Sequence, residues 1–194
     1  MHDLQTVKAN TPRMTDGEFM RFLEDNPDLR IERDANKVIY IMAPNFTRSS
    51  IINGIIIAQL SKWNLKNKLG FITDAMGSYL LPDNSLRMPD VAWIAKSSWK
   101  KLSQEERKKF VKLVPEFVVE VKSSSDSLVE LQQKMKMYVG NGVKLGWLID
   151  PAREKVWIYR GNGETDTVSG FDRSLSGENV LKGFTLKLRE LRID

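Results

Sequence analysis

Apolar residues recur along the chain with two different periods, and these periods predict its helices and strands. Spacings of three and four residues, together with capping boxes, predict helices over residues 15–26, 49–66 and 127–139, and a further helix that begins at Ser103. Short runs of β-branched and aromatic residues predict strands near residues 30–32, 38–42, 71–74, 78–81, 87–94, 115–122, 145–149, 155–159 and 184–188. This order of elements indicates an α/β fold of the α+β sandwich kind.

Length and composition indicate a soluble globular enzyme or binding protein. The chain has 194 residues, of which 41% are hydrophobic. We expect a single domain over residues 14–194, preceded by a disordered N-terminus over residues 1–13. The sequence contains no apolar stretch long enough to span a bilayer and no signal peptide. We therefore expect a cytoplasmic protein without a membrane association.

The supply of reactive side chains excludes several kinds of chemistry. Cysteine is absent, which excludes disulfides, thiolate catalysis and cysteine metal sites. The only histidine is His2, which argues against histidine zinc sites and Ser-His-Asp triads. Any hydrolytic chemistry must therefore rest on carboxylates, lysines, a hard metal ion and water.

The net charge of +5 leans towards polyanionic partners, although solubility alone also explains a charge of this size. Basic residues gather in two segments, namely Lys62, Lys66 and Lys68, and Lys100, Lys101, Arg107, Lys108, Lys109 and Lys112. Each cluster taken alone is first interpreted as a solvated helix face. Phosphate contact becomes the better interpretation only beside a nuclease site.

The predicted strand over residues 115–122 carries two charged residues at its end. Side chains alternate across a strand, so Val118, Glu120 and Lys122 share one face. Glu120 and Lys122 then project in parallel, roughly 6–7 Å apart. A carboxylate and an ammonium at the end of an apolar strand cost free energy unless they serve each other or a metal ion.

The predicted helix after this strand adds a second lysine. Its buried stripe is formed by Leu128, Leu131, Met135 and Tyr138. Lys134 flanks that stripe, whereas Lys136 points towards water. Lys134 is either a lysine that extends from the edge of the core to solvent, or a cation held over the Glu120 face and able to pair with a phosphate.

Several segments together carry a family resemblance. They are Pro89-Asp90-Val91-Ala92, residues 115–123 with Glu120-Val121-Lys122, Lys134-x-x-x-Tyr138, and Gly142-Val143-x-x-x-Trp147-Leu148-Ile149-Asp150-Pro151. In this order they resemble the Uma-two family, small proteins described as putative restriction endonucleases in the PD-(D/E)XK superfamily. The similarity covers residues 15–190. It implies a restriction endonuclease-like core, with a central mixed sheet of about four or five strands flanked by helices. It also implies Mg²⁺-dependent or Mn²⁺-dependent cleavage of DNA.

Within this resemblance, each candidate residue has an expected role. Asp90 and Glu120 are the expected metal ligands, with the backbone carbonyl of Val121 as a third, because Mg²⁺ prefers oxygen ligands. Lys122 is expected to hold or deprotonate the attacking water, or to stabilise the charge that develops on phosphorus. Lys134 is a possible accessory residue.

The chain also departs from the family and superfamily patterns. Many family members carry an apolar residue at the position of Lys122. The superfamily often places a glutamate on its first core helix, but residues 49–62 contain no acid. Glu32, on the preceding strand, is the only upstream candidate, and an exposed strand charge is the competing interpretation of it.

Two hypotheses compete with a nuclease. The chain could be a catalytically degenerate nucleic-acid-binding or oligomerisation module of the same fold, or an interaction protein that dimerises through a sheet edge.

A nuclease that cuts both strands commonly presents two active sites, so we expect a homodimer. The hairpin at residues 145–159 has many large apolar side chains, which are either buried on both faces of the sheet or shared with a partner.

Overall fold

The computed structural model describes residues 6–9 and 14–193, and for residues 6–9 it describes the backbone alone. The helices are α1 (Asp16–Asp25), α2 (Thr47–Asn67), α3 (Lys96–Trp99) and α4 (Leu128–Gly140), with 3-10 turns at Glu106–Lys108, Pro151–Arg153 and Leu188–Leu191. The strands are β1 (Thr6–Ala9), β2 (Ile31–Arg33), β3 (Ile39–Met42), β4 (Gly70–Thr73), β5 (Tyr79–Leu80), β6 (Leu86–Arg87), β7 (Val91–Ala95), β8 (Phe117–Val121), β9 (Leu145–Asp150), β10 (Lys155–Arg160), β11 (Thr165–Ser169), β12 (Ser174–Ser176) and β13 (Thr185–Lys187).

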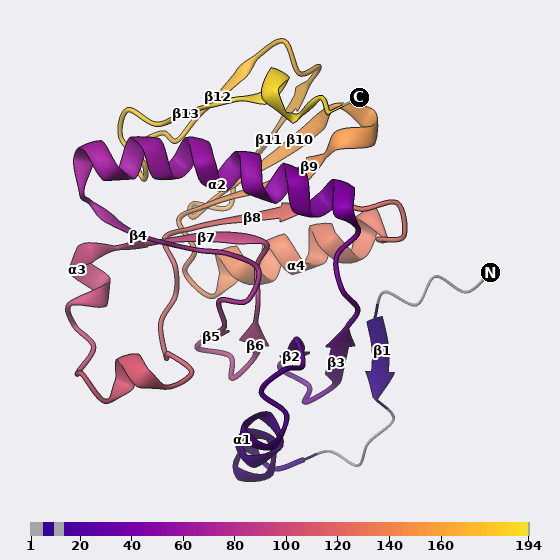
Figure 1. The fold of residues 1–194 in the computed structure, drawn as a ribbon, viewed down its shortest axis with the longest axis vertical. Coiled ribbons are helices and arrows are strands. Elements are labelled where there is room, and N and C mark those ends of the chain that lie inside the picture. The colour runs from indigo at the N-terminus through magenta and orange to yellow at the C-terminus, as the bar shows by residue number, and fades with distance from the viewer. Residues whose placement is uncertain (1–5, 10–13, 194) are drawn as a thin grey trace.

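A mixed six-stranded sheet forms the centre of the fold, in the order β11-β10-β9-β8-β7-β4 (Figure 1). Its central pair, β8 and β9, is parallel, and the other pairs are antiparallel. The helix α4 connects β8 to β9, as a parallel pair requires a crossover. This arrangement confirms the expected α/β fold with a central mixed sheet flanked by helices, but the sheet has six strands where about four or five were expected.

The alternation of β8 sends its side chains into two separate cores. Phe117, Val119 and Val121 pack on the face covered by α2 and the C-terminal segment. Val118 packs on the opposite face, with Met135 of α4. The predicted division of this strand into two faces is therefore confirmed.

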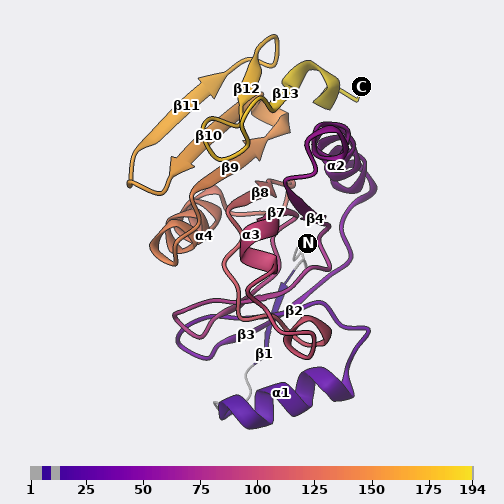
Figure 2. The same ribbon diagram turned by 90° about the vertical axis from the view of Figure 1, so that its left-hand side faces the viewer.

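A second sheet lies beside the first, in the order β1-β3-β2-β6-β5. Figure 2 shows α1 packed at the far end of this sheet, away from α2. Phe19 and Leu23 of α1 pack on Ile31, Ile39 and Leu86 of the sheet. The predicted capping box begins α1, since Thr15 and Glu18 exchange hydrogen bonds. Of the expected disordered N-terminus, Thr6–Ala9 pairs with β3, and the other residues lie outside the described ranges.

The predicted strand over residues 87–94 is wrong, because the chain changes sheets within it. β6 ends at Arg87 in the five-stranded sheet, and β7 begins at Val91 in the six-stranded sheet. Pro89 lies between the two strands, and because proline has no backbone N–H it cannot donate a hydrogen bond to a sheet there. Asp90 is therefore placed at the junction between the two sheets.

Two further predictions need correction. Ser103 and Glu106 exchange the hydrogen bonds of a capping box, but only the 3-10 turn Glu106–Lys108 follows. The segment is rich in lysine and offers no apolar stripe that could bury a longer helix. The C-terminal tail contains β11 and β12 in addition to the one strand predicted. The sequence does not predict these two strands, because strands this short and polar leave a weak pattern.

The β9–β10 hairpin is buried on both faces within the single chain. Trp147 and Ile149 join the core under α2, and Leu148 and Trp157 join the core under α4. Their burial leaves no need for a partner at this hairpin. In residues 6–9 and 14–193, no helix is long and apolar enough to cross a membrane.

Candidate active site

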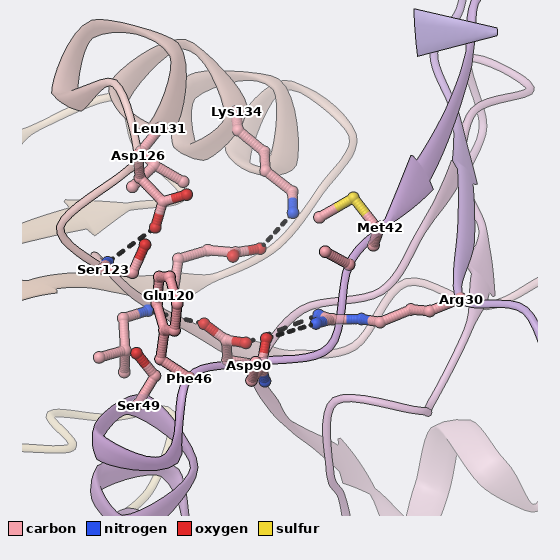
Figure 3. A pocket seen from close by; sticks show the side chains of 13 residues that line it. Arg30, Met42, Phe46, Ser49, Asp90, Glu120, Ser123, Asp126, Leu131 and Lys134 are labelled. Atoms are coloured by element: carbon pink, nitrogen blue, oxygen red, sulfur yellow. Dashed lines mark hydrogen bonds and ion pairs between the residues drawn. The ribbon is translucent and has the colours of Figure 1, made fainter. Parts of the chain in front are cut away.

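A pocket lies where β8 ends, between the two sheets, the N-terminus of α2 and the α4 helix. Its lining includes Arg30, Phe46, Asp90, Glu120 and Lys134, whose side chains Figure 3 draws around one opening. Its volume is about 60 Å³, room for a few water molecules. The pocket brings together residues from segments that are far apart in the sequence.

Asp90 is held in place from two sides. Its Oδ2 accepts a hydrogen bond from the backbone N–H of Val121 at 2.9 Å. Its Oδ1 lies 3.6 Å from the guanidinium of Arg30 (Figure 3). The bond from Val121 orients the carboxylate towards the end of β8. Each carboxylate oxygen has a further lone pair, so these contacts leave acceptor capacity for a ligand.

Glu120 is buried beside Asp90, and its contacts fall on one oxygen. Lys134 Nζ lies 2.8 Å from Glu120 Oε1, and the Tyr138 hydroxyl donates to the same oxygen at 3.0 Å. Glu120 Oε2 has no hydrogen-bond partner within the described part of the chain. Because Glu120 lines the pocket, this oxygen is the one that a ligand can use.

Burial raises the pKa of Glu120 to about 7. Lys134 opposes this rise in pKa, whereas the negative charges of Asp90 and Glu32 add to it. The carboxylates therefore lie close enough to repel one another, and the pocket is short of positive charge. A bound cation would compensate that repulsion.

Glu32 and Lys134 form a buried network behind the pocket. Glu32 Oε1 accepts from Lys134 Nζ and from the Met88 N–H, each at 2.9 Å, and Glu32 Oε2 accepts from Arg87 at 3.1 Å. Burial acts to raise the pKa of Glu32, but Lys134 and Arg87 hold it below its ordinary value. Burial acts to lower the pKa of Lys134, but Glu120 and Glu32 hold it above its ordinary value. Both groups are therefore charged near neutral pH.

This network decides between the interpretations left open for two residues. Glu32 is 3% exposed, so the interpretation as an exposed strand charge is wrong. The side chain of Lys134 is 14% exposed and contacts Glu120, so it lies over the Glu120 face instead of extending to solvent. Lys136, two residues further, is exposed as predicted.

Lys122 lies apart from these contacts. Its Nζ donates to the backbone carbonyl of Ser123 at 2.8 Å, and its side chain is not among those that line the pocket. In the described part of the chain it forms no ion pair with Glu120. β8 ends at Val121, and the backbone N–H of Lys122 still donates to the Ile149 carbonyl of β9 at 2.8 Å, so only its side chain is engaged elsewhere.

The available donors suit a hard divalent ion better than zinc. In residues 14–193, no group of three or more Asp, Glu, His or Cys side chains is arranged to hold a metal. Three carboxylates line the pocket, those of Asp90, Glu120 and Asp126, and the Oδ2 of Asp126 already accepts from the Ser123 N–H at 2.7 Å. The pocket also reaches Val121, whose carbonyl is a further oxygen donor. Mg²⁺ fits such a set, because it keeps several waters and is usually held by one or two carboxylates.

Sequence reasoning did not identify Arg30 and Arg87. Arg30 donates to the Met88 carbonyl at 3.1 Å and to Asn45 Oδ1 at 3.0 Å, and it also contacts Asp90. A usable signal exists for Arg30, because it lies two residues before Glu32 and the two should share a strand face. No comparable signal exists for Arg87, whose partner is 55 residues away in the sequence.

Comparisons with known proteins agree with this architecture. The profile of the Uma2 family, described as "Putative restriction endonuclease", matches residues 16–189. The crystal structure of a putative nuclease belonging to DUF820 from Anabaena variabilis superposes with a TM-score of 0.74. The match has 19% sequence identity and covers 92% of this chain and 97% of that chain, so the likeness shows the fold. No curated protein matches the chain.

Proposed function

This chain belongs to the Uma2 family, and we propose that it is a metal-dependent endonuclease that hydrolyses phosphodiester bonds in DNA. One observation carries the proposal. Asp90, from the junction of the two sheets, and Glu120, from the end of β8, line the same small pocket beside the buried cation of Lys134. Carboxylates can hold the hard metal ion that phosphodiester hydrolysis uses, and an adjacent lysine can stabilise charge on the phosphate.

Asp90, Glu120 and the Val121 carbonyl are the proposed ligands of Mg²⁺ or Mn²⁺. The ion supplies positive charge that acidifies a water molecule and stabilises charge on the phosphate oxygens. The Val121 N–H and Arg30 fix the carboxylate of Asp90, so that it does not have to reorganise when a ligand arrives. Tyr138 donates to Glu120 Oε1, so Oε2 stays without a bond from the described residues and can serve a ligand.

Lys134 is the cation better placed to act on a phosphate. Its ammonium is 2.8 Å from Glu120 Oε1 and its side chain lines the pocket. Glu32 positions Lys134 and balances its charge through a second contact at 2.9 Å. Lys122 stays a proposed catalytic residue, but its present bond to the Ser123 carbonyl must first be broken.

DNA is the proposed partner, and a cytoplasmic homodimer stays a prediction. The net charge of +5 favours a polyanion. The need for two active sites on a duplex still argues for a dimer. The hairpin no longer adds to that argument, since its apolar side chains are buried within one chain.

Cleavage of supercoiled plasmid and labelled oligonucleotides with Mg²⁺ or Mn²⁺ tests the proposal. The matched control is Asp90→Asn, because the amide oxygen can still accept from the Val121 N–H and preserve the local fold. We expect the unmodified chain to cleave and the variant to lose cleavage. Binding of DNA without cleavage by the unmodified chain would favour the degenerate binding module of the same fold.

A further inference from the structure

Phe46 is a large aromatic residue whose exposure the fold does not explain. It is 49% exposed and yet lines the same pocket as Asp90 and Glu120. Figure 3 draws its side chain among those of Asp90, Glu120 and the other residues that line the pocket. The fold thus leaves an apolar ring face uncovered beside charged groups.

The backbone position of Phe46 also argues against a structural role. Phe46 is the N-cap residue of α2, with φ −60° and ψ 145°, and it makes no side-chain capping bond. Serine, threonine, aspartate and asparagine are preferred at this position because their side chains accept from the first free N–H groups of the helix. Phenylalanine here weakens the helix start and exposes apolar surface. Proteins break such local rules mostly at functional or strained sites.

The size of the pocket indicates what that ligand is. With a volume of about 60 Å³, the pocket admits an ion and a few waters but not a nucleotide. The DNA strand must therefore lie across the opening, with its phosphate towards Asp90 and Glu120. The neighbouring part of the strand then meets Phe46. A flat aromatic face next to a phosphate site matches a nucleobase, which stacks readily on aromatic side chains.

We propose that Phe46 stacks on a nucleobase next to the bond that is cleaved. In a regular duplex both faces of each base are covered by its neighbours, so a side chain can stack only on a base that has left the stack. The site therefore prefers single-stranded, frayed or locally opened DNA to regular duplex. This inference rests on the proposed function, since it assumes that the phosphate lies at the carboxylates.

Binding measurements with matched oligonucleotides test the stacking directly. All proteins carry Asp90→Asn so that DNA is not consumed, and Mg²⁺ is present. The probes are a short fluorescein-labelled oligothymidylate, an abasic strand of the same length, and a hairpin duplex. Fluorescence anisotropy gives each Kd. We expect the parent protein to bind oligothymidylate more tightly than either other probe.

The decisive variant is Phe46→Ser, which removes the ring and supplies a good N-cap. We expect the Kd for oligothymidylate to rise by about fivefold to a hundredfold, as for the loss of one base stacked on an aromatic side chain. The Kd for the abasic strand should stay unchanged. The melting temperature should stay equal or rise, because the serine hydroxyl caps α2. Phe46→Trp should bind as the parent does. Leu65→Ser, at a 73% exposed position of the same helix, is the control and should change nothing.

Each other outcome overturns the inference. Stacking is rejected if Phe46→Ser binds oligothymidylate as tightly as the parent protein does. It is also rejected if the variant loses as much affinity for the abasic strand as for oligothymidylate, or if the parent protein does not bind oligothymidylate. Cleavage by the unmodified chain is scored separately. If binding prefers strands with bases and depends on Phe46, but the unmodified chain does not cleave DNA, the stacking site stands and the nuclease proposal is rejected. If the unmodified chain cleaves DNA but binding does not depend on Phe46, the nuclease proposal stands and stacking is rejected.

Discussion

Replacement of Lys134 by methionine tests the buried network that supports the candidate site. In the unmodified chain, Lys134 Nζ bridges Glu120 Oε1 at 2.8 Å and Glu32 Oε1 at 2.9 Å. Glu32 keeps its bonds from Arg87 and from the Met88 N–H in the variant. Within the described residues, Glu120 keeps only the bond from the Tyr138 hydroxyl. The variant therefore leaves a buried carboxylate without a compensating cation.

The expected loss of stability is large. Breaking a buried ion pair by removing one partner costs about 3–5 kcal/mol, because the remaining charge is buried without compensation. For a chain of this size, each kcal/mol lowers the melting temperature by roughly 2–4 °C. We therefore expect Lys134→Met to melt about 6–20 °C below the unmodified chain at alkaline pH.

The dependence of this loss on pH has a definite sign. The pKa of Glu120 in the folded chain is about 7, and Lys134 is a group that lowers it, so it rises further in the variant. When folding raises the pKa of a carboxyl, the free energy of unfolding falls as the pH increases from the pKa in the unfolded chain to the pKa in the folded chain. Below about pH 7, Glu120 is protonated in both proteins, so the loss caused by the substitution stays nearly constant there. Above pH 7 the loss grows by up to about 1.4 kcal/mol per pH unit, until the variant's own pKa is reached.

Urea unfolding near pH 6 and near pH 9 measures both effects. Lys136→Met is the matched control, because Lys136 is exposed on the same helix and should shift stability by at most about 0.5 kcal/mol. If Lys134→Met were as stable as Lys136→Met, the buried ion pairs would contribute nothing. If its loss did not change between the two pH values, the assignment of the raised pKa to Glu120 would be wrong.

Three further measurements follow from the same geometry. Calorimetric titration with Mn²⁺ should show about tenfold weaker binding near pH 6 than near pH 8, because a proton competes for Glu120 below its pKa of about 7. Glu120→Gln should bind Mn²⁺ weakly and without this pH dependence. An affinity of the unmodified chain that stays constant between these pH values would contradict the role of Glu120 as a ligand. Lys122→Met should retain Mn²⁺ and reduce cleavage less than Lys134→Met, since Lys122 bonds the Ser123 carbonyl; the reverse order of cleavage rates would restore Lys122 as the main catalytic lysine. Light scattering should give twice the mass of one 22.3 kDa chain, and the mass of a single chain would reject the homodimer.

The sequence alone determined the features that depend on neighbouring residues. The capping box of Thr15 and Glu18 begins α1 where predicted, and the spacing of apolar residues locates α2 and α4 within a few residues. The two faces of β8 follow from side-chain alternation. Such features arise from local hydrogen bonds and from the periodicity of the element, so a short window of sequence contains them.

The tertiary structure decided which charges meet. Glu32 and Lys134 are 102 residues apart in sequence, and only the packing of β2 beside α4 makes them a buried pair. The change of sheet at Pro89 places Asp90 at the pocket, and Lys122 Nζ bonds the Ser123 carbonyl instead of Glu120. The exposure of Phe46 likewise depends on which segments surround the pocket. These outcomes depend on burial and on contacts between distant segments, and the free energy of a buried charge is set by partners that local sequence does not specify.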